Sequence, residues 1–141
     1  MAQKIKLGSR PKTFARTVTF PMLEGGEGSI ALHYKYRTRK EMAELIDELQ
    51  AASHAQAEID AAALKAKADK GESIDSLKQI DFIDRELSLK VDYVLQIVDS
   101  WSLDEKFERA SVEQLADELP AALGAIVEDY RKAINEGRLG N

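Results

Sequence analysis

The sequence predicts an α+β protein that is mostly helical, with an N-terminal β-hairpin followed by a long antiparallel helical hairpin and two short C-terminal helices. Apolar residues alternate with polar ones over residues 13–37 and recur every three or four positions after residue 38. Glycines at 25, 26 and 28 separate the two alternating stretches. Alanine, glutamate, lysine and leucine are plentiful and aromatics make up only 6% of the chain, which favours helix.

Length and composition limit the class of protein. With 141 residues, the chain is expected to form one domain, residues 1–141. It has no cysteine, which excludes disulfides and thiolate metal sites. Its start, MAQKIKLGSRPKTF, lacks the apolar core of a secretory signal, and no apolar run is long enough to cross a bilayer. We therefore expect a cytoplasmic protein with no membrane partner.

Charge is unevenly distributed along the chain. Residues 1–40 hold nine Lys/Arg and two Asp/Glu, whereas residues 41–141 hold eleven and twenty-three, within a net charge of −5. The first explanation is that the basic hairpin packs near acidic helices of the same fold, and the second is pairing between copies in a homo-oligomer. Nucleic acid ranks third as a partner, because domains that bind it are usually basic overall.

The N-terminal third is expected to be a basic flexible lead-in, residues 1–12, and a β-hairpin, residues 13–37. One face of each strand carries the large apolar side chains. They are Phe14, Val18, Phe20, Ile30, Leu32, Tyr34 and Tyr36. The glycines join two strands, and no GK[ST] follows them, so a hairpin turn is favoured over a phosphate-binding loop.

Two long helices are expected next, at residues 38–70 and 73–100. Thr38 and Glu41 have the spacing of a capping box. Residues 51–70 contain nine alanines, so the distal half of the first helix is expected to project, to pack thinly, or to become ordered only with a partner. Ser73 or Asp75 is expected to cap the second helix. Its apolar seam comprises Ile80, Ile83, Leu87, Val91, Val94, Val98 and Trp101, and ordinary core packing is favoured over an intermolecular coiled coil.

Two short helices, residues 111–119 and 120–136, are expected to complete the chain. Ser111 is the expected N-cap of the first, with Gln114 in the capping-box position. Pro120 suits the first turn of the second, and Gly137 suits its C-cap.

The sequence contains no recognisable catalytic or metal-binding pattern. His33 and His54 have no metal-spaced neighbours, and no serine lies in a GxSxG turn. Carboxylates occur in pairs, such as Asp117 with Glu118, and these are expected to solvate the outer face of amphipathic helices rather than to flank a cleft. We therefore expect no enzymatic activity, no cofactor and no metal.

Two segments resemble the phage tail assembly chaperone family. The first is RTVTFPMLEGGEGSIALHYKYRTRKEMAELIDEL, and the second is LQIVDSW followed by ELPAALGAIVEDYRKAINEGRLGN. The match is carried by Tyr36, Arg37, Thr38, Arg39, Trp101, Leu119, Pro120, Tyr130, Arg138 and Asn141. The two segments cover most of the chain outside the alanine-rich middle.

The resemblance implies a small, non-catalytic protein of long-tailed bacteriophages or prophages. It would act in the host cell cytoplasm and be absent from the mature virion. Its implied partners are the tape measure protein, which it would keep soluble, and the tail tube protein, which it would recruit. The alternatives are a small nucleic-acid-binding module that uses the basic hairpin and a structural virion tail protein.

Partner binding is expected on the apolar side chains of the C-terminal third, through helix-in-groove docking. The candidates are Trp101, Leu103, Phe107, Leu115, Leu119, Pro120 and Tyr130. A lone tryptophan usually anchors a core but is also common in binding hot spots, and we favour the core role for Trp101.

Overall fold

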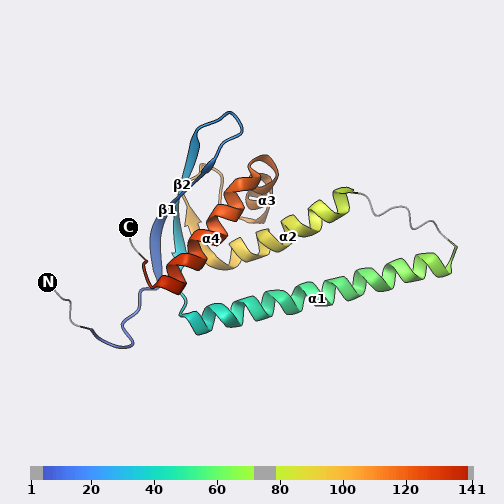
Figure 1. Ribbon diagram of the computed structural model, residues 1–141, viewed down its shortest axis with the longest axis horizontal. Coiled ribbons are helices and arrows are strands. Elements are labelled where there is room, and N and C mark those ends of the chain that lie inside the picture. The colour runs from blue at the N-terminus through green and yellow to red at the C-terminus, as the bar shows by residue number, and fades with distance from the viewer. Residues whose placement is uncertain (1–4, 72–78, 140–141) are drawn as a thin grey trace.

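The computed structural model describes residues 5–71 and 79–139, and for residues 79–84 the backbone alone (Figure 1). Its elements follow the order β1 (Thr13–Pro21), β2 (Glu27–Lys35), α1 (Arg39–Asp69), α2 (Gln79–Ile97), β3 (Val98–Trp101), α3 (Arg109–Glu118) and α4 (Pro120–Glu136). The strands form one antiparallel sheet in the order β1-β2-β3. The expected α+β, mostly helical fold is confirmed.

The hairpin of β1 and β2 buries one face of its strands, as the alternation predicts. Phe14 lies opposite Tyr34 and Val18 lies opposite Ile30, and all four are buried. The turn needs glycine, because Gly25 and Gly26 have φ of 90° and 75°, a region that other residues rarely adopt. The buried face of the sheet packs against α4 (Figure 1).

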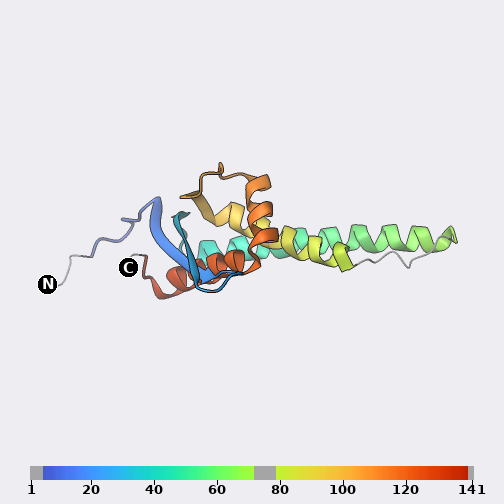
Figure 2. The ribbon, with the colours of Figure 1, turned by 90° about the horizontal axis from the view of Figure 1, so that it is seen from above.

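The helix α1 begins at the expected capping box. The Thr38 hydroxyl accepts a hydrogen bond from the Glu41 amide at 3.2 Å, and the Glu41 carboxylate accepts one from the Thr38 amide at 2.9 Å. Along α1, only Met42 and Leu45 are buried. The distal half therefore extends beyond the sheet in both views (Figures 1 and 2), as the alanine-rich composition predicts.

The end of the second long helix was wrongly predicted. The helix α2 ends at Ile97 rather than Ser100, and Val98–Trp101 form β3, which pairs with β2. Val94, Val98 and Trp101 have helical spacing, so periodicity alone could not reveal a strand that depends on a distant partner. The proposed caps Ser73 and Asp75 lie outside the described residues. The side chains of Ile80 and Ile83 are likewise not described.

Of the two C-terminal helices, α4 has the predicted bounds, whereas α3 ends at Glu118 rather than Leu119 and begins earlier than predicted. The helix α3 starts at Arg109, and its N-cap is Glu108, so the prediction that Ser111 caps it is wrong. Pro120 stands at the start of α4, and Gly137 caps its end with φ of 69°, as expected. Residues of α2, α3, α4 and the sheet share one core, to which α4 contributes Ala122, Leu123, Ile126, Tyr130, Ala133 and Ile134.

Candidate partner-binding groove

A shallow groove lies where β3, the following loop and α3 meet. Its volume is about 320 Å³, and its apolar lining comes from Trp101, Leu103, Leu115 and Leu119. The four side chains come from three places: the end of β3, the loop, and the stretch from α3 to the start of α4. Trp101, Leu103 and Leu119 are partly exposed, so the groove offers apolar surface to a partner.

Trp101 forms one wall of this groove and is held in place by two contacts. Its indole N–H donates to the Glu105 carbonyl at 2.7 Å, which satisfies the polar atom of the ring. Its ring meets Phe107 edge-on, with centroids 5.1 Å apart and an interplanar angle of 79°. A fixed indole that remains partly exposed suits an anchor for a partner as well as a core residue.

The loop after β3 is attached to the rest of the fold at both ends. At its start, the Ser102 amide donates to the Ala31 carbonyl at 3.0 Å, and the Ala31 amide donates to the Ser102 hydroxyl at 3.1 Å. At its end, the Arg109 guanidinium pairs with Asp92 of α2 at 2.7 Å. Because these contacts fix the loop, the groove is formed before any partner arrives.

The rim of the groove is acidic. Glu105 and Glu118 line it directly, together with the neutral side chains of Ser111 and Gln114. The segment 102–119 contains six acidic residues and two basic ones. One of those two cations, Arg109, is already paired with Asp92 and Glu113. The groove therefore favours a ligand that is apolar in the middle and positively charged at its edges.

Most of the residues expected to bind a partner gather here. Trp101, Leu103, Leu115 and Leu119 line the groove, and Phe107 contacts Trp101. Pro120 is exposed at the first turn of α4, directly after Leu119.

Tyr130 is an exception, and its assignment to the groove is wrong. Its side chain is fully buried between α4 and the sheet. The Tyr130 hydroxyl donates to the Lys35 carbonyl at 2.8 Å and accepts from the Arg37 guanidinium at 3.3 Å. Its ring stacks on Phe14, with centroids 6.1 Å apart. Helical periodicity marks the apolar face of α4 but does not reveal that the sheet covers it.

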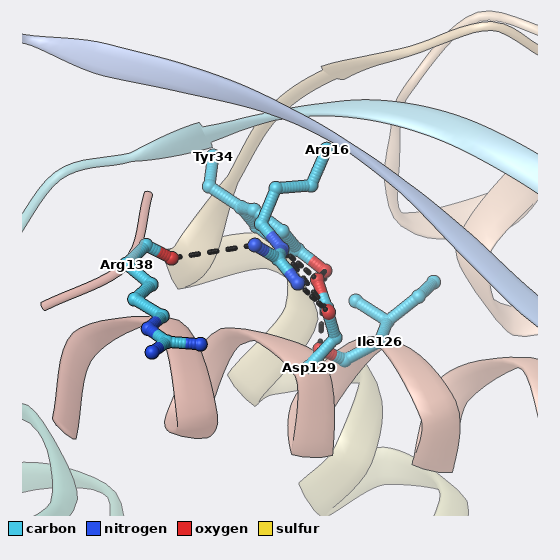
Figure 3. Close-up of polar contacts among 5 residues, drawn as sticks. All are labelled: Arg16, Tyr34, Ile126, Asp129 and Arg138. Atoms are coloured by element: carbon cyan, nitrogen blue, oxygen red, sulfur yellow. Dashed lines mark hydrogen bonds and ion pairs between the residues drawn. The ribbon is translucent and has the colours of Figure 1, made fainter. Parts of the chain in front are cut away.

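The position of α4 is fixed by a polar network that the sequence did not reveal (Figure 3). The Arg16 guanidinium of β1 donates to both carboxylate oxygens of Asp129, at 2.8 and 2.9 Å. The buried Tyr34 hydroxyl donates to the Ile126 carbonyl or the Asp129 carboxylate, each at 3.2 Å. Arg16 also donates to the Arg138 carbonyl at 3.3 Å, just beyond the end of α4.

The same network changes the acidity of its members. Burial, followed by the negative charge of Asp129, raises the pKa of Tyr34 well above that of a free tyrosine. The hydrogen bond to Asp129 raises the pKa of Arg16. Burial also raises the pKa of Tyr130. Each shift favours the form that makes these contacts, so the groups hold structure together rather than exchange protons near neutral pH.

A family model described as phage tail assembly chaperone matches residues 1–141, the whole chain. The chain belongs to this family. Neither the curated proteins nor the solved structures include a match.

The charge asymmetry of this chaperone is partly explained by its fold. Two basic residues of the N-terminal third form ion pairs with acidic residues of helices: Arg10 with Glu41 at 2.7 Å, and Arg16 with Asp129 at 2.8 Å. This observation supports the first explanation of the charge pattern, in which the basic hairpin packs near acidic helices.

Two other kinds of site were sought on the described part of the chaperone. Among the described side chains, residues 5–71 and 85–139, no cluster of three or more His, Asp or Glu could hold a metal ion. None of the described helices has the length and hydropathy needed to span a membrane.

Proposed function

We propose that the chain is a non-catalytic chaperone that binds an apolar helical stripe of the tape measure protein in the groove of Trp101, Leu103, Leu115 and Leu119. The observation that carries this proposal is a preformed, partly exposed apolar groove in a member of a tail assembly family. A long helical client with exposed apolar stripes would otherwise aggregate. Helix-in-groove docking covers such a stripe.

The acidic rim favours a particular client segment. Glu105 and Glu118 flank the apolar lining, so a stripe bordered by Lys or Arg matches the groove in charge. One groove of about 320 Å³ makes a weak contact on its own. Many copies along one client would add their contacts, and the bound copies would then bring tail tube subunits to the client. The site of action is the host cytoplasm, and the chain is absent from the finished virion.

Co-expression with the tape measure protein tests the proposal, with the soluble fraction of the client as the readout. The variant Leu103→Gln places a polar group in the apolar groove while changing only a loop side chain. We expect client affinity to fall about tenfold, because a central interface contact typically contributes more than about 1 kcal/mol. Leu23→Gln is the matched control, since Leu23 is 80% exposed at the hairpin turn, far from the groove in the sequence.

The outcome that contradicts the proposal is a client that stays equally soluble with and without this chain. If Leu103→Gln and Leu23→Gln lowered the soluble fraction of the client equally, the groove would not be the site of client binding. Mass spectrometry of purified virions separates the proposal from a structural role, because a structural tail protein would remain in the particle.

A further inference from the structure

The N-terminal arm, residues 5–9, carries the two most exposed large apolar side chains in the described part of the chain. Ile5 is 90% exposed and Leu7 is 92% exposed, and Lys6 lies between them. Two aliphatic side chains fully in water, next to a cation, add nothing to the core of their own subunit. They are therefore available to a partner.

Residues 10–12, which form the root of this arm where it joins β1, contact the rest of the fold, whereas Ile5 and Leu7 are exposed. At the root, Arg10 pairs with Glu41 at 2.7 Å, and its guanidinium lies 5.8 Å from the centre of the Tyr36 ring. The Tyr36 amide donates to the Lys12 carbonyl at 3.0 Å. In both views the arm leads away from the body, on the side opposite the distal end of α1 (Figures 1 and 2). This direction presents Ile5 and Leu7 to another molecule rather than to the chain's own groove.

The groove beside α3 complements the arm in both polarity and charge. Its lining of Trp101, Leu103 and Leu119 offers partly exposed apolar surface, and its rim carries Glu105 and Glu118. The arm and its root supply two aliphatic side chains and the cations Lys6, Arg10 and Lys12, with no acidic residue from 5 to 12. An apolar basic segment and an apolar acidic groove on the same chain form a matched pair of surfaces.

We propose that the arm of one copy docks in the acidic-rimmed groove of a second copy, with Ile5 and Leu7 on the apolar lining and Lys6 near Glu105 and Glu118. The contact is heterologous, because the two surfaces differ. Each copy that donates its arm keeps a free groove, so association continues into rings or chains. The charged part of the contact weakens as salt is added.

Sedimentation velocity on the full chain alone, from micromolar to millimolar concentration, tests this contact. The arm variant, Ile5→Ser with Leu7→Ser, removes the aliphatic side chains. The rim variant, Glu105→Lys with Glu118→Lys, reverses the charge of two exposed residues without touching the core. Leu23→Ser is the control for loss of exposed apolar surface at a different place.

We expect the wild-type chain and Leu23→Ser to associate increasingly with concentration, and to associate less at high salt. The arm variant and the rim variant should each remain monomeric. Mixed in equal amounts, they should form one-to-one dimers that do not grow, because the mixture contains one intact arm and one intact groove per pair. Only a head-to-tail contact produces this pattern.

Three outcomes would overturn the inference: a wild-type chain that stays monomeric throughout, association that survives either variant, and a mixture of the two variants that gives no dimer. The experiment contains neither the tape measure protein nor the tail tube protein, so its outcome does not depend on client binding. A chain that stays monomeric would leave the client proposal intact, and a chain that does not bind the client could still self-associate through its arm.

Discussion

Asp129 is the residue on which the contact between α4 and the sheet most depends. Its carboxylate receives three hydrogen bonds from Arg16, and it lies within hydrogen-bond reach of the buried Tyr34 hydroxyl. The exposed fractions of the Arg16 and Asp129 side chains are 20% and 18%, so water screens this ion pair less than it screens a surface pair. The pair joins residues 113 positions apart in the sequence, which fixes α4 on the hairpin.

The variant Asp129→Asn tests this role. It keeps the shape of the side chain but removes its charge, and it leaves a partly buried Arg16 without its counter-ion. We expect the free energy of unfolding to fall by about 1–3 kcal/mol, measured by urea denaturation. The control is Glu128→Gln, which removes the neighbouring carboxylate from its exposed pair with Arg131. Equal effects of the two variants would contradict a special role for Asp129.

Tyr34 makes the stability of the fold sensitive to alkaline pH. Burial and the Asp129 charge raise its pKa in the folded state above the unfolded value of about 10. Below that pH the hydroxyl is protonated in both states, so its contribution is fully present. Above it, the unfolded chain releases a proton that the folded chain retains, and stability falls as pH rises.

Thermal denaturation between about pH 8 and 12 measures this dependence. We expect the melting temperature to decline above about pH 10, and to decline less steeply in Tyr34→Phe, which has no hydroxyl to ionise. The variant starts from lower stability, since its ring no longer donates to Ile126 or Asp129. Parallel pH profiles of the two proteins would rule out Tyr34 as the source.

At the scale of elements, most local signals were read correctly from the sequence, the capping box expected at Ser111 being the exception. The capping box of Thr38 and Glu41, the proline at the start of α4 and the glycine at its end depend on neighbours within a few residues. Alternation identified the buried faces of β1 and β2, because the side-chain period of a strand is two. The thinly packed distal half of α1 followed from its alanines.

Elements that depend on distant partners could not be predicted in the same way. The strand β3 exists because residues 98–101 pair with β2, more than sixty positions earlier. The helix α3 begins at Arg109 rather than at the predicted Ser111, and the guanidinium of Arg109 pairs with Asp92 of α2. Apolar type selected Trp101, Leu103 and Leu119, which line the groove, and partner binding by these residues stays a prediction. The same criterion failed for Tyr130, whose burial is set by a sheet that comes a hundred residues earlier.

At the scale of the whole molecule, the arm and the groove are two surfaces with opposite charge. Residues 5–12 carry only positive charge, and residues 102–119 carry six acidic residues against two basic ones. A tape measure segment whose apolar stripe is bordered by Lys or Arg would bind the same groove as the arm. Both proposals together therefore imply that self-association and client binding compete.

Competition gives a prediction about affinity that neither proposal makes alone. When arms fill some of the grooves, the apparent affinity for the client equals the intrinsic affinity multiplied by the fraction of grooves that remains free. We expect wild-type chain to bind a client segment more weakly as its own concentration rises, and the arm variant Ile5→Ser with Leu7→Ser to show no such loss. Titration of a labelled tape measure segment at several chain concentrations measures this, with Leu23→Ser as the control. If the arm variant instead binds the client more weakly than wild type, Ile5 and Leu7 themselves contact the client, and the arm extends the binding surface rather than competing for it.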